Sequence, residues 1–137
     1  MSLMQIVATK GRFSDWQAVA LLASGAIAAD YAVSIFAMNE AVWGLRRDLV
    51  GRDSTVRSSF QDYETKMNEA VMMGKVEPWW ELLATLKQLG DLRLVVCALT
   101  TDVLELTQDD LMPVVDEISG VTAFAVTAGE ADVTIAL

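Results

Sequence analysis

The chemistry available to this sequence is centred on one thiol. Cys97 is the only cysteine, and it lies near the end of an apolar run from Leu92 to Leu99 that is followed by Thr100, Thr101 and Asp102. A cysteine beside the amide groups that open a helix can be stabilised as the thiolate, which is the form that attacks sulfur. The 137 residues include no histidine, which excludes a histidine base and a Ser-His-Asp triad. Cys97 is therefore the leading candidate nucleophile.

The residues after Cys97 have both a functional and a structural interpretation. Thr100 and Thr101 could hydrogen-bond an attached sulfur or a thiosulfate-like anion, or they could cap the next helix. Asp102 would oppose formation of a thiolate nearby, whereas in a first helical turn it would stabilise the helix. A free cysteine is also often buried as a small hydrophobe, so a core role for Cys97 stays open.

Two other segments supply candidate binding residues. Lys10 and Arg12 flank Gly11 after the first apolar run, where they could attract an anionic sulfur donor or simply face solvent. Asn39 follows the second apolar run and is a good helix N-cap. We expect all of these residues at one edge of a sheet, because ligands of open α/β sheets bind beyond the carboxyl ends of the strands.

The elements that must position these residues alternate between strand and helix. The alternation predicts an α/β fold, a flavodoxin-like three-layer sandwich with a central, mainly parallel sheet. Ser14, Asn39, Ser59, Thr101, Thr107 and Ser119 are expected to start helices, and Gly51 to Arg57 to form a loop. The expected strands are residues 3–9, 31–38, 92–99 and 132–137, and the expected helices are residues 15–29, 40–49, 60–73, 79–89 and 120–130.

Composition limits the class of protein. The length predicts a single domain over residues 1–137, and the apolar fraction of 53% favours burial of some surface in a homo-oligomer. A net charge of −9 argues against nucleic acid and anionic membranes as partners. One cysteine cannot form an internal disulfide, so we expect a cytoplasmic protein. The apolar run from Ala18 to Ala29 is too short to span a membrane.

Nucleotide, metal and flavin cofactors lack support in the sequence. It contains neither GxGxxG after the first strand nor GxxxxGK[ST], and a lone cysteine cannot form a cysteine-based zinc site. We therefore expect no cofactor and no metal, although a small ligand in the strand-end cleft stays open on topology alone.

The segment around Cys97 resembles a known family. Val96 to Leu106 (VCALTTDVLEL), then Asp109-Asp110-Leu111, Ser119 to Phe124 (SGVTAF) and the closing Ala131-Asp132 strand resemble the DsrE/DsrF-like (DsrE/DsrF/DsrH, TusD-like) sulfur-relay family. The resemblance covers the chain from about Val33 onward, and the region from Gly51 to Gly74 departs from it.

The resemblance implies a trimer or hexamer in which Cys97 carries sulfur as a persulfide or thiosulfonate. The leading hypothesis is therefore a sulfurtransferase-like sulfur carrier that takes sulfane sulfur from a donor protein or a small sulfur anion and passes it to a partner thiol. The alternative is a non-catalytic oligomeric binding or assembly module in which Cys97 is a buried structural residue.

Overall fold

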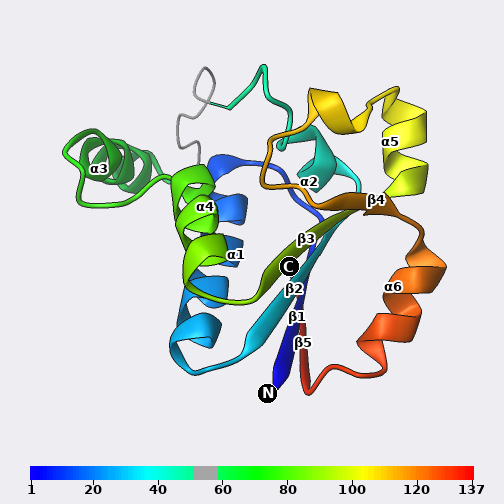
Figure 1. Ribbon diagram of the computed structural model, residues 1–137. Coiled ribbons are helices and arrows are strands. Elements are labelled where there is room, and N and C mark those ends of the chain that lie inside the picture. Colours follow the sequence, from blue (N-terminus) through cyan, green and yellow to red (C-terminus); the bar gives the residue numbers. More distant parts are fainter. Residues whose placement is uncertain (51–58) are drawn as a thin grey trace.

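The computed structural model describes residues 1–50 and 59–137. Its centre is a five-stranded sheet in the order β4-β3-β2-β1-β5, and every neighbouring pair is parallel (Figure 1). The α/β fold with a central parallel sheet is thereby confirmed. The predicted loop from Gly51 to Arg57 lies outside the described residues. The strands are β1 (Leu3–Ala8), β2 (Ala32–Ala37), β3 (Leu92–Cys97), β4 (Glu117–Ser119) and β5 (Val133–Ala136).

One face of the sheet forms the main core. Ile6, Ile35 and Leu94 are aligned across the three central strands and are fully buried. Helices α1 (Phe13–Ala28) and α4 (Trp79–Leu89) cover this face (Figure 1). Alternate side chains of a strand point to opposite faces, so each strand contributes every second residue to this core.

Aromatic side chains join α1 to α4. Trp16 is fully buried, stacks on Trp79 with 5.3 Å between ring centroids, and donates a hydrogen bond from Nε1 to the Ala41 carbonyl oxygen. Trp80 meets both Phe13 and Trp79 edge to face, with 6.0 Å and 5.5 Å between ring centroids. The four rings therefore form one aromatic cluster between α1 and α4.

The other face of the sheet is covered less completely. Helices α5 (Ala98–Leu104) and α6 (Val121–Ala128) lie on this side (Figure 1). None of the eight residues of α6 is buried, and its Phe124 stacks on Phe36 of β2 with 4.5 Å between ring centroids. The remaining elements are α2 (Glu40–Trp43), α3 (Gln61–Met72) and the 3₁₀ helix η1 (Gln108–Asp110).

Several predicted element ends differ from the structure. Helix α1 begins at Phe13 with Arg12 as its N-cap, so Ser14 lies inside the helix. Helix α2 ends at Trp43 instead of continuing to Leu49. Phe60, rather than Ser59, is the N-cap of α3. Residues Ala18 to Ala28 of the apolar run belong to α1, and no helix within the described ranges is long and apolar enough to cross a bilayer.

Candidate functional site

Cys97 stands at the junction that the sequence indicates, but its side chain is buried. It ends β3, and its extended backbone (φ −69°, ψ 121°) is the N-cap of α5. Only 2% of the residue is exposed. The register pairs Cys97 with Ser119 of β4, and Cys97 shares a sheet face with Val95 because two residues separate them. The thiol therefore lies on the α5 and α6 side of the sheet, away from the main core.

The start of α5 corrects the interpretation of the residues that follow. The helix begins at Ala98, immediately after the cysteine, so Thr101 is not its N-cap and Asp102 is not in its first turn. The Thr101 hydroxyl instead donates to the Ala98 carbonyl oxygen at 2.9 Å, and Asp102 is exposed. The free amide groups of the first turn thus belong to residues 98–100, closer to Cys97 than the sequence suggests.

Asn39 and Thr100 meet at the strand ends. The Asn39 amide nitrogen donates to Thr100 Oγ1 at 3.2 Å, which joins the end of β2 to the first turn of α5. Asn39 is the N-cap of α2, as predicted, but its side chain makes no capping bond and its φ is +54°. A positive φ is costly for a residue other than glycine, so the hydrogen bond to Thr100 helps to hold a strained turn.

Gly11 lies in a tight backbone contact beside α2. A Cβ at Gly11 would come within 2.2 Å of the Glu40 carbonyl oxygen, and a Cβ at Gly44 within 2.4 Å of the Gly11 carbonyl oxygen. The Gly11 amide also donates to Glu40 Oε1 at 3.2 Å. Only glycine allows backbones to approach this closely, so packing accounts for Gly11.

Lys10 is exposed and lies away from Cys97. It lines a cavity of about 180 Å³ with Thr9, Asp15 and Leu137, at the ends of β1 and β5. Strand β2 separates β1 from β3, and neighbouring strands are about 4.8 Å apart, so the ends of β1 and β3 are about 10 Å apart. The structure groups Asn39, Thr100 and Cys97, and places Lys10 at a different part of the edge.

Ser119 is a neighbour of the thiol that the sequence interpretation assigns to another role. It is expected to start the final helix, but it ends β4 opposite Cys97, and Gly120 is the N-cap of α6. Strand β4 is only three residues long, which is too short for a periodic signal in the sequence. Asp116 positions this strand, since its Oδ2 accepts hydrogen bonds from the Leu94 amide at 2.7 Å and from Lys87 Nζ at 2.5 Å.

Among the described residues, the strand edge holds no cluster of metal ligands. Across residues 1–50 and 59–137, no cluster of three or more His, Cys, Asp or Glu side chains could hold a metal ion. What the strand edge does offer is one thiol, the Thr100 hydroxyl and the first amide groups of α5. This arrangement suits nucleophilic sulfur chemistry once the thiol is accessible.

The parallel sheet with helices on both of its faces makes this a three-layer α/β protein, and its one cysteine lies at the carboxyl end of β3 (Figure 1). The model of the DsrE/DsrF/DrsH-like family matches residues 47–136, so the chain belongs to this family and is associated with sulfur relay in general. A solved structure, that of the protein of unknown function MTH1491 from Methanobacterium thermoautotrophicum, aligns with a TM-score of 0.58 and 19% identity over 100% of both chains. At this identity the likeness shows the fold alone. A search of curated proteins finds no match.

Proposed function

We propose that this protein is a sulfur carrier in which Cys97 holds sulfane sulfur as a persulfide or thiosulfonate. In the persulfide form, the Cys97 thiolate attacks the outer sulfur of a donor persulfide, the donor thiolate leaves, and the new sulfur–sulfur bond stays on Cys97. An acceptor thiolate on a partner protein then takes the outer sulfur and regenerates the Cys97 thiolate. Each step exchanges one sulfur–sulfur bond for another, so no oxidant or reductant is required.

The observation that carries the proposal is the position of the only cysteine. Cys97 lies at the carboxyl end of β3 and directly before the first turn of α5, in a chain that belongs to a sulfur-relay family. The amide groups of a helical first turn favour negative charge, so they would support a thiolate or a terminal persulfide anion. Thr100 adds a hydroxyl in the same turn.

Burial of Cys97 adds a requirement to the mechanism. With 2% of the residue exposed, a donor cannot reach Sγ until a neighbouring element moves. Helix α6 is the best candidate for this movement, because it has no buried residue and lies on the face to which Cys97 points. Elements with few buried apolar contacts open at lower free energy than the core does.

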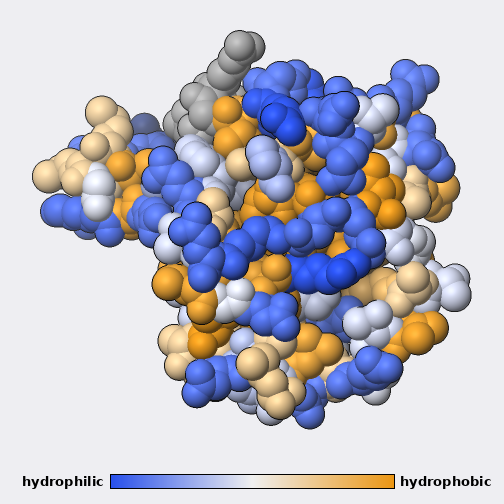
Figure 2. Space-filling model, in the orientation of Figure 1, coloured by the Kyte–Doolittle hydropathy of each residue, from blue (hydrophilic) through white to orange (hydrophobic). Residues whose placement is uncertain are grey.

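The same burial favours a second candidate function. If Cys97 is a structural residue, the protein is an oligomeric binding or assembly module whose role lies in its surfaces. Exposed apolar side chains on α5 support this alternative: Leu99 is 69% and Val103 is 72% exposed. The space-filling view shows apolar surface among hydrophilic residues (Figure 2). Under either function we propose a cytoplasmic homo-oligomer that acts with a partner protein.

Sulfur loading tests the carrier function. The native protein is incubated with persulfide, polysulfide and thiosulfate donors, and its intact mass is measured. The carrier gains one or more sulfur atoms, a reductant removes them, and the Cys97→Ser variant gains none. If no donor adds mass to the wild-type protein, the sulfur-carrier function is contradicted. The binding or assembly module is then the function that the structure supports.

A further inference from the structure

The sheet face that α6 covers carries a polar row, which is unusual in a parallel sheet. Strands that are covered on both faces are normally apolar on both. Here Gln5, Ser34 and Arg93 are aligned on β1, β2 and β3, and the register continues to Thr134 of β5. These residues point away from the main core, since they alternate with Ile6, Ile35 and Leu94.

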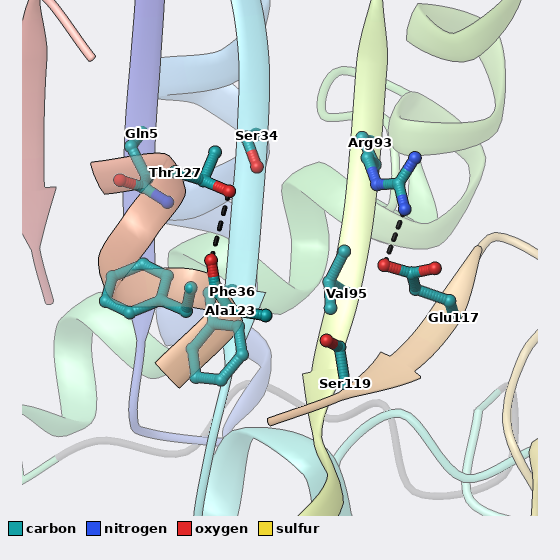
Figure 3. Close-up of a pocket in the computed structure, with 10 residues that line it drawn as sticks. Gln5, Ser34, Phe36, Arg93, Val95, Glu117, Ser119, Ala123 and Thr127 are labelled. Atoms are coloured by element: carbon teal, nitrogen blue, oxygen red, sulfur yellow. Dashed lines mark hydrogen bonds and ion pairs between the residues drawn. The ribbon is translucent and has the colours of Figure 1, made fainter. Parts of the chain in front are cut away.

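A pocket lies between this row and α6. Its volume is about 290 Å³, close to the lower end of the usual range of about 300–1,000 Å³ for small-molecule sites. Figure 3 shows polar side chains from β1, β2, β3 and α6 toward one end of the pocket, and Phe36 and Val95 toward the other. The lining residues are Gln5, Ser34, Phe36, Arg93, Val95, Glu117, Ser119, Ala123, Phe124 and Thr127.

Gln5 carries one of the two buried side-chain polar atoms that lack a hydrogen-bond partner within the described residues; the other is Ser14 Oγ, which lies outside this pocket. Gln5 is 1% exposed, and within the described residues its Oε1 has no hydrogen-bond partner. A buried acceptor without a partner costs free energy, so its presence in a strand calls for an explanation. A ligand that donates a hydrogen bond into this pocket would supply the missing partner.

Opposite charges stand on another side of the same pocket. Arg93 and Glu117 form an ion pair, and their side chains are 56% and 46% exposed (Figure 3). Exposed ion pairs contribute little to stability, so a ligand can engage both partners at small cost. Arg93 suits a carboxylate, because its planar guanidinium binds two oxygens at once, and Glu117 suits an ammonium group.

The spacing of these groups selects the size of the ligand. Gln5 and Arg93 are separated by one strand, so their Cα atoms are about 10 Å apart. The Arg93 guanidinium turns toward Glu117, so the two ends of the pocket are set by the Arg93–Glu117 pair on one side and by Gln5 on the other (Figure 3). We propose that this pocket binds a free α-amino acid whose side chain ends in a hydrogen-bond donor. Its carboxylate contacts Arg93, its ammonium group contacts Glu117, and its side chain extends across the pocket to donate to Gln5.

Amino-acid binding in this pocket does not require sulfur transfer by Cys97. Binding uses polar groups of the strand row and an apolar surface, and it involves no thiol. The Cys97→Ser variant is therefore expected to bind the amino acid as tightly as the wild-type protein does. This separates failure of the pocket proposal from failure of the sulfur carrier.

Calorimetric titration with L-glutamine tests the proposal on the full chain, with L-glutamate as the isosteric probe. L-Glutamine is expected to bind at least tenfold more tightly, because the L-glutamate carboxylate cannot donate to Gln5 Oε1. Gln5→Leu and Arg93→Met each weaken L-glutamine binding at least tenfold. The matched controls Gln88→Leu and Lys66→Met, at exposed positions outside the pocket, leave it within twofold.

Two results overturn the proposal. One is absence of L-glutamine binding, or equal affinity for L-glutamate. The other is that Gln5→Leu and Arg93→Met alter the mass of the protein in light scattering without altering affinity, which would make this face a contact between copies of the chain.

Discussion

Access to Cys97 through α6 can be tested by removing the aromatic contact that holds this helix. Phe124 is partly buried and stacks on Phe36, which is 2% exposed. Replacing a fully buried phenylalanine with alanine costs about 3–5 kcal/mol, so a partly buried one should cost about 2 kcal/mol. If this loss of about 2 kcal/mol destabilises only the state in which α6 packs on the sheet, the fraction of Phe124→Ala molecules in which α6 has moved away rises about 30-fold.

The assay is the rate at which iodoacetamide alkylates Cys97 in the native protein. When a segment recloses faster than the reagent reacts, the observed rate is proportional to the open population. Phe124→Ala is therefore expected to raise the alkylation rate about 30-fold. Val126→Ala is the matched control on the same helix, and because Val126 is 68% exposed, the rate should stay within about twofold of wild type.

A second control separates local opening from global unfolding. Leu86 lies on α4 and is 4% exposed, so Leu86→Ala should cost about 2–5 kcal/mol of global stability without loosening α6. Its alkylation rate should stay near that of wild type. An unchanged rate in Phe124→Ala, or an equal increase in Leu86→Ala, would refute access through α6.

Three further predictions follow from the packing and charges. Gln5→Leu removes a buried acceptor without a partner, so it should raise the free energy of unfolding by about 1–3 kcal/mol in urea titrations. Gly11→Ala should lower it by about 2 kcal/mol, because the new Cβ would meet the Glu40 carbonyl oxygen at 2.2 Å. The Thr107 backbone amide, followed by its hydroxyl, holds the pKa of Asp110 below its ordinary value. This carboxylate therefore stabilises the fold above its unfolded pKa, and the stability difference from Asp110→Asn should shrink as the pH falls below about 4.

Matched substitutions give each of these predictions a control. Gln88→Leu, at an exposed position of α4, should change stability by less than about 0.5 kcal/mol. Gly25→Ala, in α1 with open space around its Cβ, should be neutral or stabilising by up to about 1 kcal/mol. Destabilisation by Gln5→Leu, tolerance of Gly11→Ala, or a pH-independent effect of Asp110→Asn would contradict the corresponding argument.

Much of the fold is predictable because its periodic segments are long. The strands at residues 3–9, 31–38 and 92–99 and the helix at residues 79–89 are found within two residues of their predicted ends. Thr107, which is expected to start a helix, is the N-cap of η1, and it forms a capping box with Asp110 through two local hydrogen bonds. Local signals of this kind do not depend on tertiary contacts.

Short elements and junctions are less predictable. Strand β4 has three residues and is held by Asp116 through contacts with Lys87 and β3, which are distant in sequence. Helix α5 starts at Ala98 because the chain turns directly at Cys97, although Thr101 has the better capping side chain. Tertiary packing therefore overrides local preference at the candidate site.

The burial of Cys97 is not predictable from its place in the sequence either. Whether a strand-end thiol is exposed depends on the helices that fold over it, and the pattern around Cys97 suits both outcomes. Gln5 and Arg93, by contrast, do leave a signal in the sequence. Each is a polar residue within an apolar strand, which in a parallel sheet indicates a special environment.

The most direct test of the central claim follows one sulfur atom onto and off Cys97. Native protein is loaded with a persulfide donor, freed of excess donor, and analysed by peptide mass spectrometry before and after addition of a thiol acceptor. The account predicts about one sulfur per chain on the Cys97 peptide and its transfer to the acceptor without loss of the fold. Sulfur found elsewhere, or a Cys97 thiol modified only after denaturation, would contradict the sulfur-carrier function.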